Sequence, residues 1–168
     1  MADRGLRRGS GYSGAPRLCA VLTRFDRQDG QVVTTGSALT PQLLRAAVDG
    51  HAGAWPSLFA ASHDELLTAA EGLSLRVTAT SVRRVLSAMQ SETISPADAQ
   101  AWASFVRRGY VEARQGPVRP VAVEYDSASE AEIVEVVGRL DEIGDLVDGA
   151  PPDSTEIDAL MASLGEPD

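Results

Sequence analysis

The chain has 168 residues, of which 43% are hydrophobic, so it is long enough for one core and too apolar to be wholly disordered. Aromatic residues make up only 5% of it, which favours helices packed through small side chains over a β-sandwich. The net charge of −9 is uneven, because residues 1–27 hold six Arg and two Asp whereas residues 121–168 hold one Arg and fourteen acidic residues; such asymmetry indicates a charged tail or a surface for a charged partner.

The first 39 residues are predicted to contain little regular structure. Residues 1–17 are rich in Gly, Ser and Arg and are expected to form a disordered basic arm. Residues 18–39 are predicted to be irregular or a short hairpin, because runs rich in Val and Thr flank Asp29-Gly30, which is a hairpin signal. A β-ribbon over residues 18–35 would be marginal alone, and a loosely ordered arm is the alternative.

From residue 40 onward the pattern predicts a helical bundle domain, residues 40–168. Thr40 and Pro41 are suited to begin a first helix that Gly50 ends. A capping box at residues 62–65 begins a second helix, which stops near residue 72.

Two further helices follow before residue 110. The third covers about residues 81–90 and places four apolar side chains on one face: Val82, Val85, Leu86 and Met89. The fourth begins at Ser95-Pro96, ends near Gly109 and buries a stripe of apolar residues: Ala99, Trp102, Phe105 and Val106. Trp102 is therefore predicted to be a core residue.

The rest of the chain is predicted to hold an extended segment and two helices. Residues 116–125 contain two prolines and alternating apolar residues, which favours an extended connection or an edge strand. A long helix is predicted over about residues 127–148, with a capping box at its start and Gly149 as its stop. A last helix runs from Asp153, boxed by Glu156, to Gly165. These elements predict an all-α fold, a small helical bundle of five or six helices.

The predicted long helix has two distinct faces. Six apolar residues fall in one arc of roughly 120°: Ile133, Val136, Val137, Leu140, Ile143 and Val147. Most of the acidic residues fall on the remainder, and Asp141, Asp145 and Asp148 are spaced to form one ridge. Carboxylates near a helix C-terminus oppose the helix dipole. The ridge is thus either a solvated face or a surface for a basic partner.

The sequence carries no pattern typical of an enzyme. Cys19 is the single cysteine, and neither His51 nor His63 has a Cys or His at metal-ligand spacing. No nucleotide-binding or hydrolase motif occurs, and no apolar run approaches the ~18 residues that a membrane span needs. The acidity of the C-terminal half opposes nucleic-acid binding there. We expect a cytoplasmic binding protein without enzymatic activity, cofactor, metal or membrane contact.

Residues 82–111 (VRRVLSAMQSETISPADAQAWASFVRRGYV) and residues 127–149 (SASEAEIVEVVGRLDEIGDLVDG) are similar in layout to the colicin D immunity-like family. The resemblance covers about residues 80–165. It implies a helical bundle that binds the nuclease domain of a bacterial toxin and blocks its basic, tRNA-binding active site. The residues that match the family's contacting acids by position, together with Glu142 from the polar side of the predicted helix, form the candidate set: Asp98, Glu124, Asp126, Asp141, Glu142, Asp145 and Asp148.

Two functions are consistent with these observations. The first is an immunity-type inhibitor that presents carboxylates where a nuclease binds phosphates, with complementary fields that speed association. The second is a regulatory or adaptor module, without a toxin partner, whose basic arm and acidic helices bind separate proteins.

Overall fold

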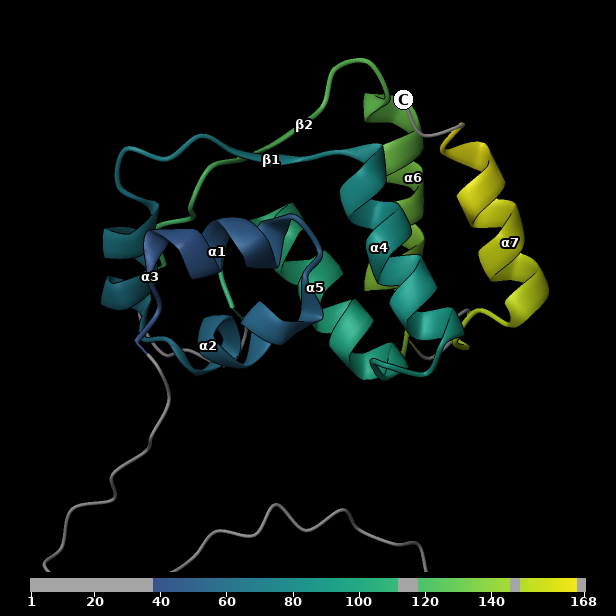
Figure 1. Ribbon diagram of the computed structural model, residues 1–168, viewed down its shortest axis with the longest axis horizontal. Coiled ribbons are helices and arrows are strands. Elements are labelled where there is room, and N and C mark those ends of the chain that lie inside the picture. The colour runs from purple at the N-terminus through teal and green to yellow at the C-terminus, as the bar shows by residue number, and fades with distance from the viewer. Residues whose placement is uncertain (1–37, 112–117, 146–148, 166–168) are drawn as a thin grey trace, which may run out of the picture. The chain divides into compact units, whose positions relative to one another are not determined.

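A computed structural model describes residues 38–111, 118–145 and 149–165 (Figure 1). The chain divides into two units, residues 1–34 and 35–168, and every described residue belongs to the second. The elements of this unit follow in chain order: α1 (Pro41–Val48), the 3₁₀ helix η1 (Ala52–Ala54), α2 (Trp55–Ala60), α3 (His63–Ala70), β1 (Leu75–Val77), α4 (Ala79–Gln90), α5 (Pro96–Arg108), β2 (Val123–Tyr125), α6 (Glu130–Asp141) and α7 (Ser154–Ser163). The predicted helical bundle is confirmed. The predicted arm and the predicted β-ribbon lie outside the described residues.

The N-termini of several helices are capped as the sequence predicts. The Thr40 side chain accepts a hydrogen bond from the N–H of Leu43 at the start of α1. Reciprocal capping boxes begin α3, at Ser62, and α5, at Ser95. Each cap satisfies backbone donors that the first turn of a helix leaves without a partner.

The core of the unit is built around two tryptophan rings. Trp102 of α5 is completely buried, and its ring stacks on that of Trp55, with ring centroids 6.3 Å apart. Both indole N–H groups donate to the carbonyl of Ala47 in α1, at 2.9 Å from Trp102 and 3.3 Å from Trp55. The core role predicted for Trp102 is therefore confirmed. Because one carbonyl accepts from both rings, α1, α2 and α5 are held in one arrangement.

A two-stranded parallel sheet joins distant parts of the sequence. Leu75 of β1 pairs with Val123 of β2, and Val77 pairs with Tyr125. The N–H of Asp126 extends the pairing by donating to the carbonyl of Val77, at 2.9 Å. The extended character predicted for residues 116–125 is confirmed at Val123–Tyr125, whereas the partner strand β1 was not predicted. In Figure 1 both strands run along one margin of the helical layer.

Three helical predictions need correction. The helices η1 and α2 were not predicted, because α2 has six residues and no side-chain cap. α4 begins at Ala79 and not near residue 81, because Thr78 and Ser81 form a capping box one turn earlier. The predicted helix over residues 127–148 is wrong in length, because α6 covers Glu130–Asp141 only.

α6 is short because both of its ends differ from the prediction. Its N-cap Ser129 makes no side-chain capping hydrogen bond, so neither predicted capping box forms there. At the other end Gly144 adopts a φ of +92°, which is incompatible with continuing the helix. The N–H of Gly144 donates to the carbonyl of Gly149 at 2.6 Å, which closes a turn in place of a further helical turn.

Candidate binding surface

One face of α6 packs against the rest of the unit and the opposite face is open. The apolar residues predicted for the core are buried: Ile133, Val136, Val137 and Leu140 from the helix, and Ile143 just after it. Val147, the sixth of them, lies outside the described residues. α6 packs against α5 and α4, and Figure 1 shows it beside α4, with α7 to the right of both. These helices cover one side of α6 and leave the other to solvent.

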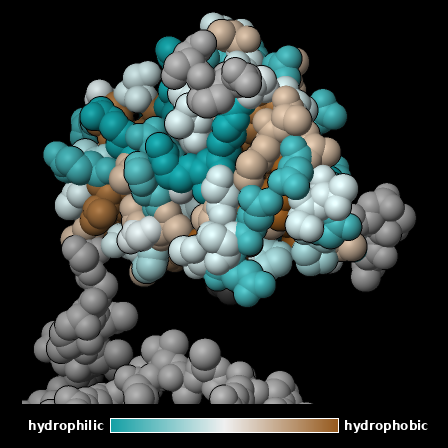
Figure 2. All heavy atoms as spheres, turned by 45° about the vertical axis from the view of Figure 1, so that its right-hand side comes forward, coloured by the Kyte–Doolittle hydropathy of each residue, from teal (hydrophilic) through white to brown (hydrophobic). Residues whose placement is uncertain are grey.

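The open side of α6 combines acidic residues with a small apolar centre, and we refer to it as the α6 face. Its members are exposed except for the half-buried Gly138: Glu130, Ala131, Val134, Glu135, Gly138 and Glu142. On a helical wheel they fall within an arc of roughly 140°. Val134 is 47% exposed, and it is the one exposed large hydrophobic residue in the described part of the chain. Elsewhere, on the side shown in Figure 2, hydrophilic side chains predominate and apolar atoms form separate small patches.

The carboxylates of the α6 face form no ion pair with a described residue. Neither Glu130, Glu135 nor Glu142 takes part in an ion pair there, and the same is true of Asp145, which is exposed in the turn after the helix. Arg139 is the one basic residue after position 120. Its guanidinium binds the Glu156 carboxylate of α7 at 2.6 Å and the carbonyl of Ala150 at 2.9 Å. The local negative charge therefore faces solvent without compensation.

Asp141 has a different environment from the one predicted. It is the last residue of α6, its side chain is only 6% exposed, and its Oδ2 accepts from Arg107 Nη1 at 2.6 Å. Arg108 Nη2 lies 3.6 Å from the same oxygen. The predicted ridge of Asp141, Asp145 and Asp148 is therefore wrong: Asp141 points into the α5–α6 contact, Asp145 lies beyond the helix, and Asp148 is outside the described residues.

Tyr125 belongs to the same electrostatic environment. Burial raises the pKa of its hydroxyl above the ordinary value of 10.0. The positive charge of Arg107 lowers that pKa, and the negative charge of Asp141 raises it further. The net direction is upward, so the folded protein favours the neutral phenol over the phenolate.

The remaining predicted residues fall into two groups at the two ends of α6. Glu124 and Asp126 precede the helix, and Arg76 of β1 lies 3.8 Å from a carboxylate oxygen of each. Ion pairs as exposed as these contribute little to stability, so both carboxylates are accessible to a partner. Glu142 follows the helix and is about 18 Å from Glu130, the first residue of α6, along the helix axis. The structure therefore does not bring the whole candidate set together.

Asp98 belongs to neither group, because it lies about 200° around α5 from Gln100, the residue that reaches α6. It stands in the first turn of α5, and two residues later Gln100 Nε2 lies 3.4 Å from the Asp141 carbonyl. The first two turns of α5 thus adjoin the C-terminal end of α6. Asp98 is exposed and completes the capping box of α5.

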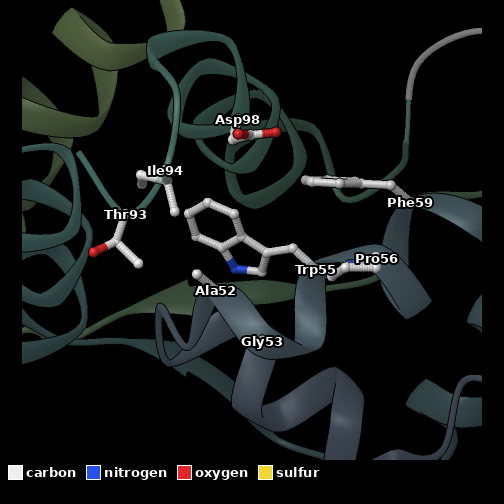
Figure 3. A pocket seen from close by; sticks show the side chains of 8 residues that line it. All are labelled: Ala52, Gly53, Trp55, Pro56, Phe59, Thr93, Ile94 and Asp98. Atoms are coloured by element: carbon white, nitrogen blue, oxygen red, sulfur yellow. The ribbon is translucent and has the colours of Figure 1, made fainter. Parts of the chain in front are cut away.

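An open groove of about 420 Å³ lies next to Asp98, between α2 and the loop that precedes α5. Its walls include Trp55, Pro56 and Phe59 on one side and Ile94 on the other. In Figure 3 the Trp55 ring lies between Ile94 and Phe59, with the Asp98 carboxylate above them. The sequence analysis missed this groove, although the spacing of Trp55 and Phe59 by four residues, soon after Gly53, is a signal of a short aromatic helix.

No family model, no curated protein and no solved structure matches the chain. Across the described ranges, no three or more His, Cys, Asp or Glu side chains are grouped so that they could hold a metal ion. In the same ranges, every helix is too short or too polar to cross a membrane.

Proposed function

We propose that the chain is a cytoplasmic, non-enzymatic binding protein of the immunity type, which occludes the basic active site of a toxin nuclease. The observation that carries the proposal is the α6 face, where exposed carboxylates that form no ion pair with a described residue share one side of the helix with an exposed Val134. Protein interfaces commonly combine an apolar centre with a polar rim. Here the charge of the rim selects a basic partner.

A nuclease fits this surface better than an arbitrary basic protein does, for an electrostatic reason. Its active site must attract phosphates, so it concentrates positive potential in one cleft. Glu135 and Glu142 lie two turns apart on the same side of the α6 face, which sets their carboxylates out along a line, as phosphates lie along a nucleic-acid backbone. The layout shared with the colicin D immunity-like family points to the same class of partner.

Asp141 has a supporting role in this proposal. Its ion pair with Arg107 joins the end of α6 to α5. The inhibitor would therefore use buried charge to position the helix and exposed charge to bind. Glu124 and Asp126 extend the acidic surface beyond the start of α6.

The test begins with capture of partners from the source organism by the full chain, followed by identification of the bound protein. We expect a nuclease, whose cleavage of tRNA is suppressed by stoichiometric amounts of the chain. Replacing Glu130, Glu135 and Glu142 with Gln should slow association on the order of tenfold at low salt and flatten its salt dependence.

The matched control removes the same charge elsewhere, by Asp64→Asn, Glu71→Gln and Glu92→Gln, three exposed positions on other elements. This control should associate nearly as fast as the unchanged chain. A captured partner without nuclease activity would refute the inhibitor and leave the adaptor module as the better explanation. Equal slowing by both triple variants would show that total charge matters and that the α6 face does not.

A further inference from the structure

The groove between α2 and the loop before α5 is not used by the α6 face, yet it adjoins the same end of the structure. Its walls are almost entirely apolar, and Asp98 is the one charged residue that lines it. Trp55 and Ile94 are buried, so an occupant meets mainly the exposed Pro56 and the half-buried Phe59, and it must offer a positive charge to Asp98. A lysine or an arginine side chain has this dual character, with an apolar stem and a cationic end.

The two oxygens of Asp98 are differently engaged. Oδ2 accepts from the Ser95 N–H at 3.0 Å and from the Ser95 hydroxyl at 2.7 Å. Oδ1 takes part in no hydrogen bond with the described residues, and Asp98 is exposed. One carboxylate oxygen is thus held in place by the cap while the other remains available to a donor from outside the chain.

The aromatic lining favours an arginine side chain over a lysine side chain. Trp55 and Phe59 have ring centroids 6.3 Å apart and planes inclined by 53°, so they form an angled wall beneath the carboxylate (Figure 3). Of the two rings only that of Phe59 is partly exposed, and a planar guanidinium can stack on it while it pairs with a carboxylate, whereas a strongly hydrated ammonium does so less well. Arginine is also enriched among the residues that dominate binding energy at interfaces.

We propose that this groove receives an arginine side chain of the basic partner, with the stem against Pro56 and Phe59 and the guanidinium on Asp98 Oδ1. The inference rests on the proposed function, which supplies the basic partner. It adds a second contact, beside the C-terminal end of α6, to the contact made by the α6 face. An anion is disfavoured in the same place, because the Asp98 carboxylate stands at the groove and already accepts the N–H of Ser95.

The first test uses the full chain and a minimal probe, N-acetyl-arginine amide, with the uncharged N-acetyl-citrulline amide as its isostere. The side-chain N–H resonances of Trp55 and Trp102 are followed during the titration. We expect a saturable shift of Trp55 with the arginine probe, with a Kd in the millimolar range, and a smaller shift of the fully buried Trp102. The citrulline probe should bind about fivefold more weakly.

Two variants and one control locate the effect. Asp98→Asn keeps an acceptor for the Ser95 N–H, so α5 stays capped, and should weaken the arginine probe by about fivefold. Phe59→Leu should weaken it by removing the ring while keeping apolar bulk. Asp64→Asn, which also changes an exposed acid in the first turn of a helix, should have no effect. Thermal melting of each variant shows whether it is folded.

The proposal is overturned if both probes shift Trp55 equally, if neither gives a saturable shift, or if folded Asp98→Asn binds the arginine probe as well as the unchanged chain does. Binding of the captured nuclease to the variants tests this inference separately from the proposed function. If the Gln triple variant loses nuclease binding and Asp98→Asn keeps it in full, the groove does not contact the nuclease. The proposed inhibitor function then still stands. If the groove binds the arginine probe selectively but no nuclease is captured, the proposed inhibition of a nuclease is refuted. The preference of the groove for arginine then still stands.

Discussion

Trp102 contributes to the fold through both its ring and its N–H group. It is fully buried, stacks on Trp55 and donates to the Ala47 carbonyl. Trp102→Ala should lower the free energy of unfolding by about 3–5 kcal/mol, because the surrounding helices cannot close the space left by the ring. Chemical denaturation measures the change.

Trp102→Phe is the control for the hydrogen bond. The Ala47 carbonyl keeps the N–H of Trp55 as a donor, so this variant should lose much less stability than the Ala variant does. An Ala variant within about 1 kcal/mol of the unchanged chain would contradict the core role of the ring.

Tyr125 gives the stability a dependence on alkaline pH. Since burial raises the pKa of its hydroxyl, the unfolded chain loses this proton at a lower pH than the folded protein does. The stability that results is fully present below the ordinary pKa of 10.0 and is lost as the pH rises through the folded value. Urea unfolding at about pH 8 and about pH 11 should show a smaller fall for Tyr125→Phe than for the unchanged chain. Equal falls in both proteins would assign the alkaline sensitivity to other groups.

The contact between α5 and α6 includes a partly buried ion pair between Asp141 and Arg107. Asp141→Ala should cost about 1–2 kcal/mol, which is modest for a hydrogen bond to a charged group because the Arg107 side chain is 46% exposed. A double-mutant cycle with Arg107→Ala should show coupling, since the second substitution removes little once the carboxylate is gone. Additive effects would show that the pair does not hold the helices together.

The comparison between sequence and structure is clearest for these elements. Local signals were sufficient at Thr40, Ser62, Ser95 and Gly109, because a cap or a left-handed glycine acts within one turn. They failed for β1, where three residues form a strand because β2 lies beside them. Strand pairing between distant segments has no local signature of this kind.

The candidate site was predicted unevenly for a similar reason. The acidic side of α6 follows from the sequence, since a wheel separates Glu130 and Glu135 from the apolar arc. The environment of Asp141 does not, because its partner Arg107 comes from another helix. The predicted helix continued through Gly144, whereas the positive φ of this residue is incompatible with a helix, and this moved Asp145 off the predicted ridge.

At the scale of the whole chain, the second unit should be independent of the first residues. Residues 1–17 contain only Met1, Leu6 and Tyr12 as large apolar side chains, and residues 35–168 form a compact unit of their own. Deleting residues 1–17 should therefore leave the melting temperature within about a degree or two, as measured by circular dichroism. A larger decrease would show that the deleted residues pack on the helices.

The parallel pairing of β1 with β2 has a consequence for the kinetics of folding. The strands cannot meet through a hairpin, since α4 and α5 lie between them along the chain. The pairing therefore closes a long loop. Closing this loop reduces the entropy of the chain before the contacts that offset the loss have formed. We expect the helices to form early and the joining of Leu75–Val77 to Val123–Tyr125 to limit the rate. A substitution at Val77 should then slow refolding, whereas one of equal cost at Ile157 in α7 should mainly speed unfolding.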